Sequence, residues 1–454
     1  MSKTTPLSHL SLVCLLAMPI SAVAGGSDDA AGLDRGPVKP VTAVSADRFL
    51  SSLGVNTHVD QGYDPKTYIA PLRYLGIRAV RDGIRHVDGD ILIARATGVH
   101  FAITSGGDLD GELASARMLA QAGALLAPEG PNEPNNFPIT FAGVQGGGRD
   151  GGSWKPVAAF QAALYRAVRH DPVLAHYPVF GPSETGAETE NVGLQFRTTP
   201  QGFAGAAAAG TAYSDFLNIH NYVSGVHGGY GDNQAWQAAD PVLDGRWDGL
   251  FGNSGSTWRR HFRGYDAAAL TAQPRVTTET GWDSVSDPGG EAAQAAVLSN
   301  TYLAQFKRGW RYTFIYELKD EEGGPGHQGL FAGDRPKLAA QYIHALTTIL
   351  ADHATTADPG KLAFAITTGA RTVHDLLLQK SDGSFDLVIW NEQSHGQADV
   401  TVTFATQQPA VEIYDIAQGT APIKDLHDTT DLKLTLTDHA MIIHVIPSGA
   451  PAQP

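Results

Sequence analysis

The chain has 454 residues, of which 42% are hydrophobic and 17% charged, which suits one large folded domain followed by a smaller one. Its formal net charge is −15, from 32 basic and 47 acidic residues. This surplus of acidic residues argues against nucleic acid or an anionic membrane as the main partner, because both bind basic surfaces. A neutral partner is more compatible with the composition.

The first 24 residues have the pattern of a secretory signal peptide. Lys3 precedes an apolar run over 10–20, and Ala22-Val23-Ala24 supplies the small residues of a cleavage site. The run is too short to span a bilayer and no later segment is apolar enough, so we predict no membrane insertion. Cleavage near Ala24 would give a secreted or periplasmic protein.

The only cysteine, Cys14, lies within this predicted signal peptide. The mature chain would therefore contain no cysteine, and neither a disulfide nor thiol chemistry is expected. Residues 25–44 contain glycine, proline and acidic residues, and we expect them to form a flexible leader.

Between residues 45 and 355, short apolar runs alternate with amphipathic, alanine-rich stretches. Eight runs are predicted strands: 49–55, 77–81, 99–104, 122–127, 178–181, 215–220, 275–278 and 312–316. Predicted helices between them include 66–75, 111–121, 157–170, 291–308 and 337–351. Such alternation indicates parallel strands joined by crossover helices, and eight units predict an α/β fold, the (β/α)8 TIM barrel. A Rossmann-like sheet is the alternative, but no G-x-G-x-x-G follows the first run and no P-loop lysine motif is present.

Beyond about residue 360 the helical period gives way to alternation, as in "HDLLLQKSDGSFDLVIWNE" and "ADVTVTFA". Ser-Asp-Gly between two apolar runs is typical of a β-hairpin. We therefore predict a small all-β antiparallel sandwich domain over 360–447, followed by a frayed tail at 448–454.

Each predicted barrel strand ends in polar or aromatic residues, and a barrel brings all these ends to one face, where active sites form. The stretch "PEGPNEPNN", residues 128–136, follows the fourth run and is too rich in proline for a helix or a strand. It carries Glu133, and Glu279 follows the seventh run. Carboxylates at the ends of strands four and seven would face each other, and a separation of about 5–5.5 Å suits retaining glycoside hydrolysis.

These residues resemble a known family. Asn132-Glu133-Pro134 on strand four and Glu279 on strand seven are similar to the motifs of clan A of the glycoside hydrolases, the 4/7 retaining enzymes. The resemblance covers about residues 45–350, and a β-sandwich after the barrel is common in the clan. Glu279-Thr280-Gly281-Trp282 resembles the nucleophile signature of plant-type β-glucanases, although Asp283 stands where they have proline.

The resemblance implies a role for each matching residue. Glu133 would be the acid/base, Glu279 the nucleophile, and Asn132 the partner of the substrate 2-hydroxyl. Arg81, at the end of the second run, corresponds to an arginine near the nucleophile, and His220-Asn221-Tyr222 corresponds to a strand-six motif whose tyrosine contacts it. An arginine and a tyrosine are neighbours that keep a carboxylate ionised. The predicted substrate-binding residues are Asn132, Arg81, His220, Tyr222, Trp282, Glu317 and Lys319.

One position departs from the family pattern. Many clan members have a tryptophan at the end of strand eight, under the sugar, whereas this chain reads Tyr316-Glu317-Leu318-Lys319. The sugar platform, and with it the sugar, is therefore left open.

Simpler interpretations stand beside these assignments. Glu129 would orient the loop or face solvent, His220 would be a satisfied core histidine, and Trp282 would pack in the barrel. Asp108 to Glu112 has acidic residues that suggest a calcium loop, but its glycine is misplaced for an EF-hand. No metal and no cofactor are expected.

Three classes of function are compatible with these patterns. The first is a secreted retaining β-glycosidase with a carbohydrate substrate, and the second is a non-catalytic glycan-binding protein on a degenerate barrel. A metal-dependent hydrolase is the weakest, because His58 and His220 lack H-x-H or H-E-x-x-H spacing. The presence of both glutamates favours the enzyme.

Overall fold

The computed structural model describes residues 37–148, 152–183, 196–202, 205–222, 272–286, 289–321, 326–370, 372–392 and 396–447. The predicted signal peptide, most of the predicted leader and the predicted tail lie outside these residues. Within the described residues, no helix combines the length and the apolar character needed to cross a membrane.

Parallel strands form the centre of the larger domain. Seven of them make one sheet in the order β6-β5-β4-β3-β11-β10-β9. Phe180 forms parallel bridges with Glu129 of β6 and with Phe216 beside β9, so an eighth extended segment closes the ring. This confirms the predicted (β/α)8 fold class. The strands are β3 (Leu53–Asn56), β4 (Ala79–Asp82), β5 (His100–Thr104), β6 (Leu125–Glu129), β9 (Leu217–Asn218), β10 (Arg275–Thr280) and β11 (Trp310–Ile315).

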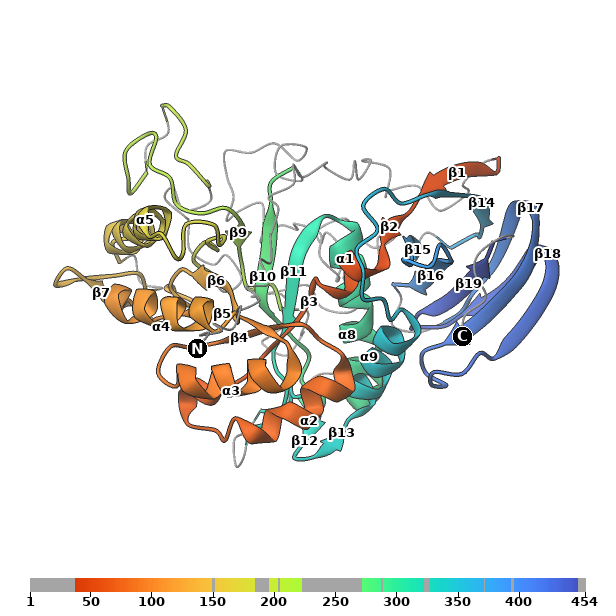
Figure 1. Cartoon of the computed structure of the whole chain (residues 1–454), viewed down its shortest axis with the longest axis horizontal. Coiled ribbons are helices and arrows are strands. Elements are labelled where there is room, and N and C mark those ends of the chain that lie inside the picture. Colours follow the sequence, from red (N-terminus) through yellow and green to blue (C-terminus); the bar gives the residue numbers. More distant parts are fainter. Residues whose placement is uncertain are drawn as a thin grey trace, which may run out of the picture.

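Helices surround this ring (Figure 1) and bury their apolar faces against the outward-facing strand residues, such as Val80 and Ile103. The first predicted strand, 49–55, is wrong in its first half, because Phe49 and Leu50 end a short helix. A short apolar run does not distinguish a buried helix from a strand. In the described residues the helices are α1 (Ala46–Leu50), η1 (Val59–Gln61), α2 (Lys66–Leu75), α3 (Val87–Thr97), α4 (Leu109–Gln121), α5 (Lys155–His170), α8 (Gly290–Lys307) and α9 (Leu338–Ile349).

Apolar side chains fill the inside of the barrel, and their positions show which polar residues point inward. Ala79 and Ala127 belong to the interior cluster, with Ala102, Phe180, Val276, Tyr312 and Phe314. Side chains two residues apart on a strand point to the same face. Arg81 follows Ala79 by two residues and Glu129 follows Ala127 by two, so both charges point inward at the carboxyl ends of their strands.

Two short hairpins flank the barrel strands. β7 (Ile139–Phe141) and β8 (Val144–Gly146) pair antiparallel after the proline-rich loop. β12 (Phe331–Ala332) and β13 (Arg335–Pro336) pair antiparallel before α9.

Six C-terminal strands and two N-terminal ones, β1 (Lys39–Thr42) and β2 (Val44–Ser45), form one connected sheet, in the order β1-β14-β17-β19-β16-β15-β2 with β18 beside β17. Its pairs are antiparallel except β15 with β2, and the predicted Ser-Asp-Gly hairpin joins β15 to β16. The two ends of the sheet share one hydrophobic core. Stacking of these halves as a sandwich stays a prediction. The strands of this region are β14 (Lys361–Thr367), β15 (Val373–Gln379), β16 (Phe385–Asn391), β17 (Ala398–Asp415), β18 (Lys424–Leu436) and β19 (Met441–Ile446).

The predicted flexible leader at 25–44 is wrong for its last residues. β1 (Lys39–Thr42) pairs antiparallel with β14, and β2 (Val44–Ser45) pairs parallel with β15. Figure 1 shows these red N-terminal strands beside the blue C-terminal ones. The partner strands lie more than 300 residues away in the sequence, so no local pattern could indicate the pairing.

The sheet packs on the barrel through β15 and β16, which are buried on both faces. Leu376 and Val388 join the hydrophobic cluster of the barrel helices, whereas their neighbours Leu377 and Leu387 join the core of the sheet. Helices α8 and α9 therefore lie between the barrel strands and the C-terminal sheet.

A buried ion pair fastens this contact. Arg308, at the end of α8, donates from Nη1 and Nη2 to the two carboxylate oxygens of Glu392 at 3.0 and 3.2 Å. Trp390 Nε1 donates to the same carboxylate at 3.0 Å. Burial opposes ionisation of Glu392, but the charges of Arg308 and His374 outweigh it and hold the pKa of Glu392 well below its usual range.

We expect Glu392→Gln to lower the free energy of unfolding by about 3–5 kcal/mol, because it leaves Arg308 buried without its counter-charge. Urea unfolding of the purified protein followed by circular dichroism measures the change. Arg335→Gln is the control, because Arg335 and Glu291 form an exposed ion pair. Losses of equal size in the two variants would contradict the assigned role of the buried pair.

A histidine at the same interface should make stability depend on pH. His439 lies 2.9 Å from an oxygen of Asp415 and 2.9 Å from one of Asp438, and its ring contacts that of Tyr342 on α9 at 5.5 Å. Burial lowers the pKa of His439, but hydrogen bonds to the two aspartates outweigh it and raise the pKa to about 9.

Because the folded state favours protonated His439, its stabilisation is complete below pH of about 6.5 and is lost as pH rises through about 9. We expect the melting temperature to fall over this window, and the fall to be smaller in His439→Gln. Exposed His427, replaced in the same way, is the control. Identical pH dependence in wild type and His439→Gln would rule out this contribution.

Candidate active site

The stiff loop after β6 aims Glu133 into the barrel mouth. Glu133 has a backbone φ of 40°, a left-handed conformation that is uncommon for a residue other than glycine and costs about 1–3 kcal/mol. Its carbonyl accepts hydrogen bonds from the amides of Asn136 and Phe137, each at 2.8 Å. Asn136 Nδ2 also donates to the Glu133 carboxylate at 2.8 Å. These bonds hold the strained turn and fix the direction of the carboxylate.

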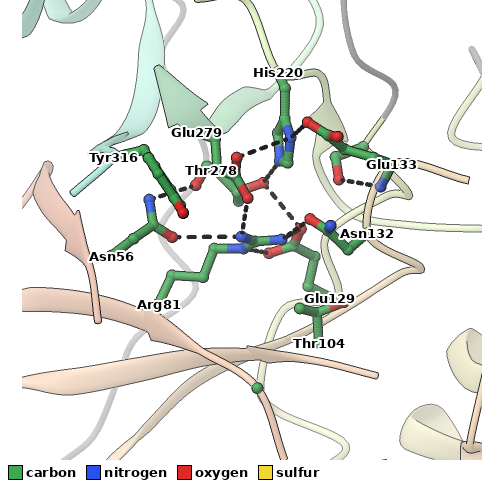
Figure 2. A network of polar contacts seen from close by, with 12 residues as sticks. Asn56, Arg81, Thr104, Glu129, Asn132, Glu133, His220, Thr278, Glu279 and Tyr316 are labelled. Carbon is green, nitrogen blue, oxygen red and sulfur yellow. Dashed lines mark hydrogen bonds and ion pairs between the residues drawn. The ribbon is translucent and has the colours of Figure 1, made fainter. Parts of the chain in front are cut away.

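His220 brings the two predicted catalytic glutamates together (Figure 2). Its Nδ1 lies 2.8 Å from Glu133 Oε1 and 3.5 Å from Glu279 Oε2, and its Nε2 lies 3.0 Å from Thr278 Oγ1. One carboxylate oxygen of Glu133 lies within 4.8 Å of one of Glu279. His220 is fully buried, so it is a satisfied core histidine as well as a part of the site.

Both oxygens of Glu279 accept a hydrogen bond. Arg81 Nη1 donates to Oε1 at 2.7 Å, and the Tyr222 hydroxyl donates to Oε2 at 2.6 Å. Strand alternation would send Glu279 and Thr278 to opposite faces, but β10 has a register irregularity between Thr277 and Thr280, and both side chains reach the site. Burial and then the charge of Glu279 raise the pKa of Tyr222 well above its usual range, so the hydroxyl stays a donor.

Arg81 connects the remaining polar groups. Its Nε and Nη2 donate to the two oxygens of Glu129 at 2.8 and 2.9 Å, and Nη2 also donates to Asn132 Oδ1 at 2.8 Å. Nη1 reaches Asn56 Oδ1 at 3.4 Å in addition to Glu279. All five guanidinium N–H groups are thereby used. Because the oxygen of Asn132 is bonded to Arg81, its amide can offer N–H donors to a ligand.

Glu129 differs from its predicted place. The sequence predicts that it orients the loop or faces solvent, but its exposed fraction is 0%. In addition to Arg81, its Oε1 accepts from Thr278 Oγ1 at 2.9 Å and from Asn218 Nδ2 at 3.2 Å. Its position two residues after inward-facing Ala127 is the sequence signal that could have indicated this.

The structure separates the other predicted substrate-binding residues. Trp282 is 1% exposed within the hydrophobic cluster of the barrel, in agreement with the packing interpretation. Lys319 Nζ contacts Asp334 at 3.4 Å, outside the network around Arg81. Glu317 is buried at the edge of the site, where its carboxylate lies 3.0 Å from Nδ1 of His58.

Aromatic rings border the site on the side of β11. The Tyr316 ring lies 5.2 Å from that of His58 and 6.2 Å from that of Tyr222, measured between ring centres. Figure 2 shows Tyr316 beside Asn56 and Glu279, at the position where the family resemblance expects a tryptophan. Burial raises the pKa of Glu317, whereas its carboxylate raises that of His58 against the effect of burial.

Two groups of described residues place potential metal ligands within 4.8 Å of one another: Glu133, His220 and Glu279, and His58, Glu317 and Glu321. In each group the histidine already lies at hydrogen-bond distance from a carboxylate, at 2.8 and 3.0 Å. These hydrogen bonds account for the short distances.

No protein-family model and no curated protein matches the sequence. Solved structures share its fold. A family 39 glycoside hydrolase from Bacteroides cellulosilyticus WH2 is 16% identical at a TM-score of 0.54, covering 89% of this chain and 82% of that chain. A family 30 endoxylanase from Clostridium papyrosolvens C71 is 11% identical at 0.52, covering 90% and 98%. A family 51 arabinofuranosidase from Xanthomonas axonopodis pv. citri is 13% identical at 0.51, covering 90% and 100%.

Gly130 offers a test of how tightly the loop is built. A Cβ at this position would lie 2.7 Å from the backbone nitrogen of Pro182 and 2.8 Å from its Cα, and backbone cannot move aside as a side chain can. We expect Gly130→Ala to lower the free energy of unfolding by about 1–3 kcal/mol. A Cβ added at Gly106 would meet no atom within 4 Å, so Gly106→Ala is the matched control. Unchanged unfolding of Gly130→Ala in urea would show that the loop is looser than described.

Proposed function

We propose that the protein is a secreted retaining β-glycosidase that hydrolyses O-glycosidic bonds of a poly- or oligosaccharide through a glycosyl-enzyme intermediate. The proximity of Glu133 and Glu279, with oxygens within 4.8 Å, carries the proposal. One oxygen of each carboxylate within this limit is compatible with the carboxyl separation of about 5–5.5 Å that retaining enzymes use. The signal-peptide pattern at 1–24 supports secretion.

The contacts support different catalytic roles for the two carboxyl groups. Glu279, held by Arg81 and Tyr222, would attack the anomeric carbon and form an ester while Glu133 protonates the departing glycosidic oxygen. Glu133 would then take a proton from water as the water attacks the anomeric carbon and releases Glu279. His220 contacts Glu133 at 2.8 Å and is placed to orient it through both steps.

Other groups would recognise the sugar. Asn132, oriented by Arg81, is placed to bind the 2-hydroxyl, where a hydrogen bond strengthens as the transition state forms. Tyr316 would offer its ring as the sugar platform in place of the family's tryptophan. The neighbours in fold include proteins described as an endoxylanase and an arabinofuranosidase, which supports a glycan substrate without selecting the sugar.

The alternative is a glycan-binding protein on a degenerate barrel. Such a protein would need sugar contacts but no close pair of carboxylates that are each held by polar side chains. Arg81 and Tyr222 on Glu279, and Asn136 and His220 on Glu133, therefore favour the enzyme.

The catalytic pair can be tested by azide rescue on an activated aryl glycoside. Glu133→Ala leaves the nucleophile in place, so the glycosyl-enzyme should form and accumulate, and azide should release it as a sugar azide with the configuration of the substrate. Glu279→Ala has no attacking group, so hydrolysis should stop and azide should give the inverted product. Nuclear magnetic resonance of the sugar azides reads the configuration.

Glu112→Gln is the control for this experiment, because Glu112 is a fully buried barrel carboxyl that bonds Ser105 and not the catalytic pair. The Glu112→Gln variant should hydrolyse the aryl glycoside without added azide. A retained azide from Glu279→Ala, or undiminished hydrolysis of the natural glycan by either active-site variant, would overturn the assignment. A wild type that binds glycans but cleaves none would favour the binding protein.

A further inference from the structure

We propose that Glu129 is a positioning residue of this site, whose carboxylate orients the Arg81 guanidinium so that one arginine serves both Glu279 and Asn132. The inference rests on the proposed function, in which Glu279 attacks the sugar and Asn132 binds its 2-hydroxyl. Glu129 would touch neither the substrate nor the reacting atoms, and would act only through Arg81.

The geometry of the pair fixes the plane of the guanidinium. The Nε and Nη2 atoms of Arg81 face the two carboxylate oxygens of Glu129 at 2.8 and 2.9 Å, an arrangement of two parallel hydrogen bonds. With one edge held in this way, the remaining N–H groups point to Glu279 at 2.7 Å and to Asn132 at 2.8 Å. Figure 2 shows Arg81 between Glu129 and Glu279.

Glu129 is itself held on three sides, so it can act as a fixed reference for Arg81. Thr278 and Asn218 donate to its Oε1 at 2.9 and 3.2 Å. Its backbone belongs to β6 and bridges Phe180 in the adjacent extended segment. The side chain is fully buried, so water does not compete for these bonds.

The charges give a second reason for this carboxylate. Arg81 is buried with two carboxylates, Glu129 and Glu279, and although burial opposes its charge, the two carboxylates, Glu129 first, raise the pKa of Arg81 above its usual range. Glu129 compensates the positive charge, so Glu279 receives one hydrogen bond from Arg81 and not a two-pronged ion pair. Without Glu129, the guanidinium would turn both its outer donors to Glu279, occupy the lone pairs needed for attack, and release Asn132.

A purely structural buried ion pair is the competing explanation, and the chain contains a matched example. Arg308 and Glu392 form a two-pronged buried pair at the contact between barrel and sheet, away from the site. Glu392→Gln is therefore the control for Glu129→Gln: both variants remove one buried carboxylate charge from an arginine, but only one of the arginines contacts the site.

Crystal structures of Glu129→Gln, Glu129→Asp and Glu392→Gln test the proposal directly. In Glu129→Gln we expect the Arg81 guanidinium to leave Asn132 and to bond both oxygens of Glu279. In Glu129→Asp, which keeps the charge, and in Glu392→Gln, we expect Arg81 to keep its contact with Asn132. An unmoved Arg81 in Glu129→Gln would overturn the proposal. If Glu129→Gln does not fold, Glu129→Ala takes its place: loss of the contact between Arg81 and Asn132 in that variant supports the proposal, and an unmoved Arg81 overturns it.

Kinetics on an aryl glycoside that the wild type hydrolyses supply the second measurement, below the melting temperature of every variant. We expect Glu129→Gln to lower kcat on the order of 100-fold with KM changed little. A displaced Arg81 would misplace Glu279 and Asn132, and such misplacement mainly destabilises the transition state. Glu129→Asp should recover part of the loss. The preference for the glycoside over its 2-deoxy counterpart should shrink in Glu129→Gln and persist in Glu392→Gln. A loss of kcat no larger than that of Glu392→Gln would contradict the role.

Failure of the two proposals would look different. A wild type that hydrolyses no glycoside would contradict the proposed function, whereas the crystal structures would still show whether Glu129 orients Arg81. If the wild type is active and Arg81 is unmoved in Glu129→Gln, only the positioning role is contradicted.

Discussion

A buried guanidinium is the constraint on which the site depends. Arg81 has no bulk water around it, so each of its five N–H groups needs a protein acceptor. The acceptors come from four places in the chain: Asn56 on β3, Glu129 on β6, Asn132 on the following loop, and Glu279 on β10. The closed ring of strands brings these four ends together, so the site depends on the fold of the barrel.

The rest of the molecule holds that ring in place. Below the polar mouth, the apolar interior cluster fills the barrel and leaves the inward-facing charges only at the carboxyl ends. On the outside, α8 and α9 are packed between the strands and the C-terminal sheet, and the pair of Arg308 with Glu392 fastens them. The sheet therefore supports the barrel from outside without supplying a residue to the network around Arg81.

The loop after β6 contributes stiffness of a different kind. Its prolines limit the backbone, and Glu133 is held at a φ of 40° by bonds from Asn136 and Phe137. Strain at a polar residue in a barrel mouth is typical of functional positions, where surrounding contacts maintain a conformation that the residue would not adopt alone. The same loop places Asn132 against Arg81, so it positions both Asn132 and Glu133.

Repeating features and the residues at strand ends could be predicted from the amino-acid sequence alone. Alternation of apolar runs with helical periods predicted eight barrel strands, helix 66–75 with the bounds found, and Glu133 with Glu279 at opposing strand ends. The burial of Glu129 and the pairing of β1 with β14 could not be predicted, because each depends on partners distant in the chain: Arg81 is 48 residues from Glu129. Local sequence encodes period and polarity, whereas the environment of a side chain is set by which strands become neighbours.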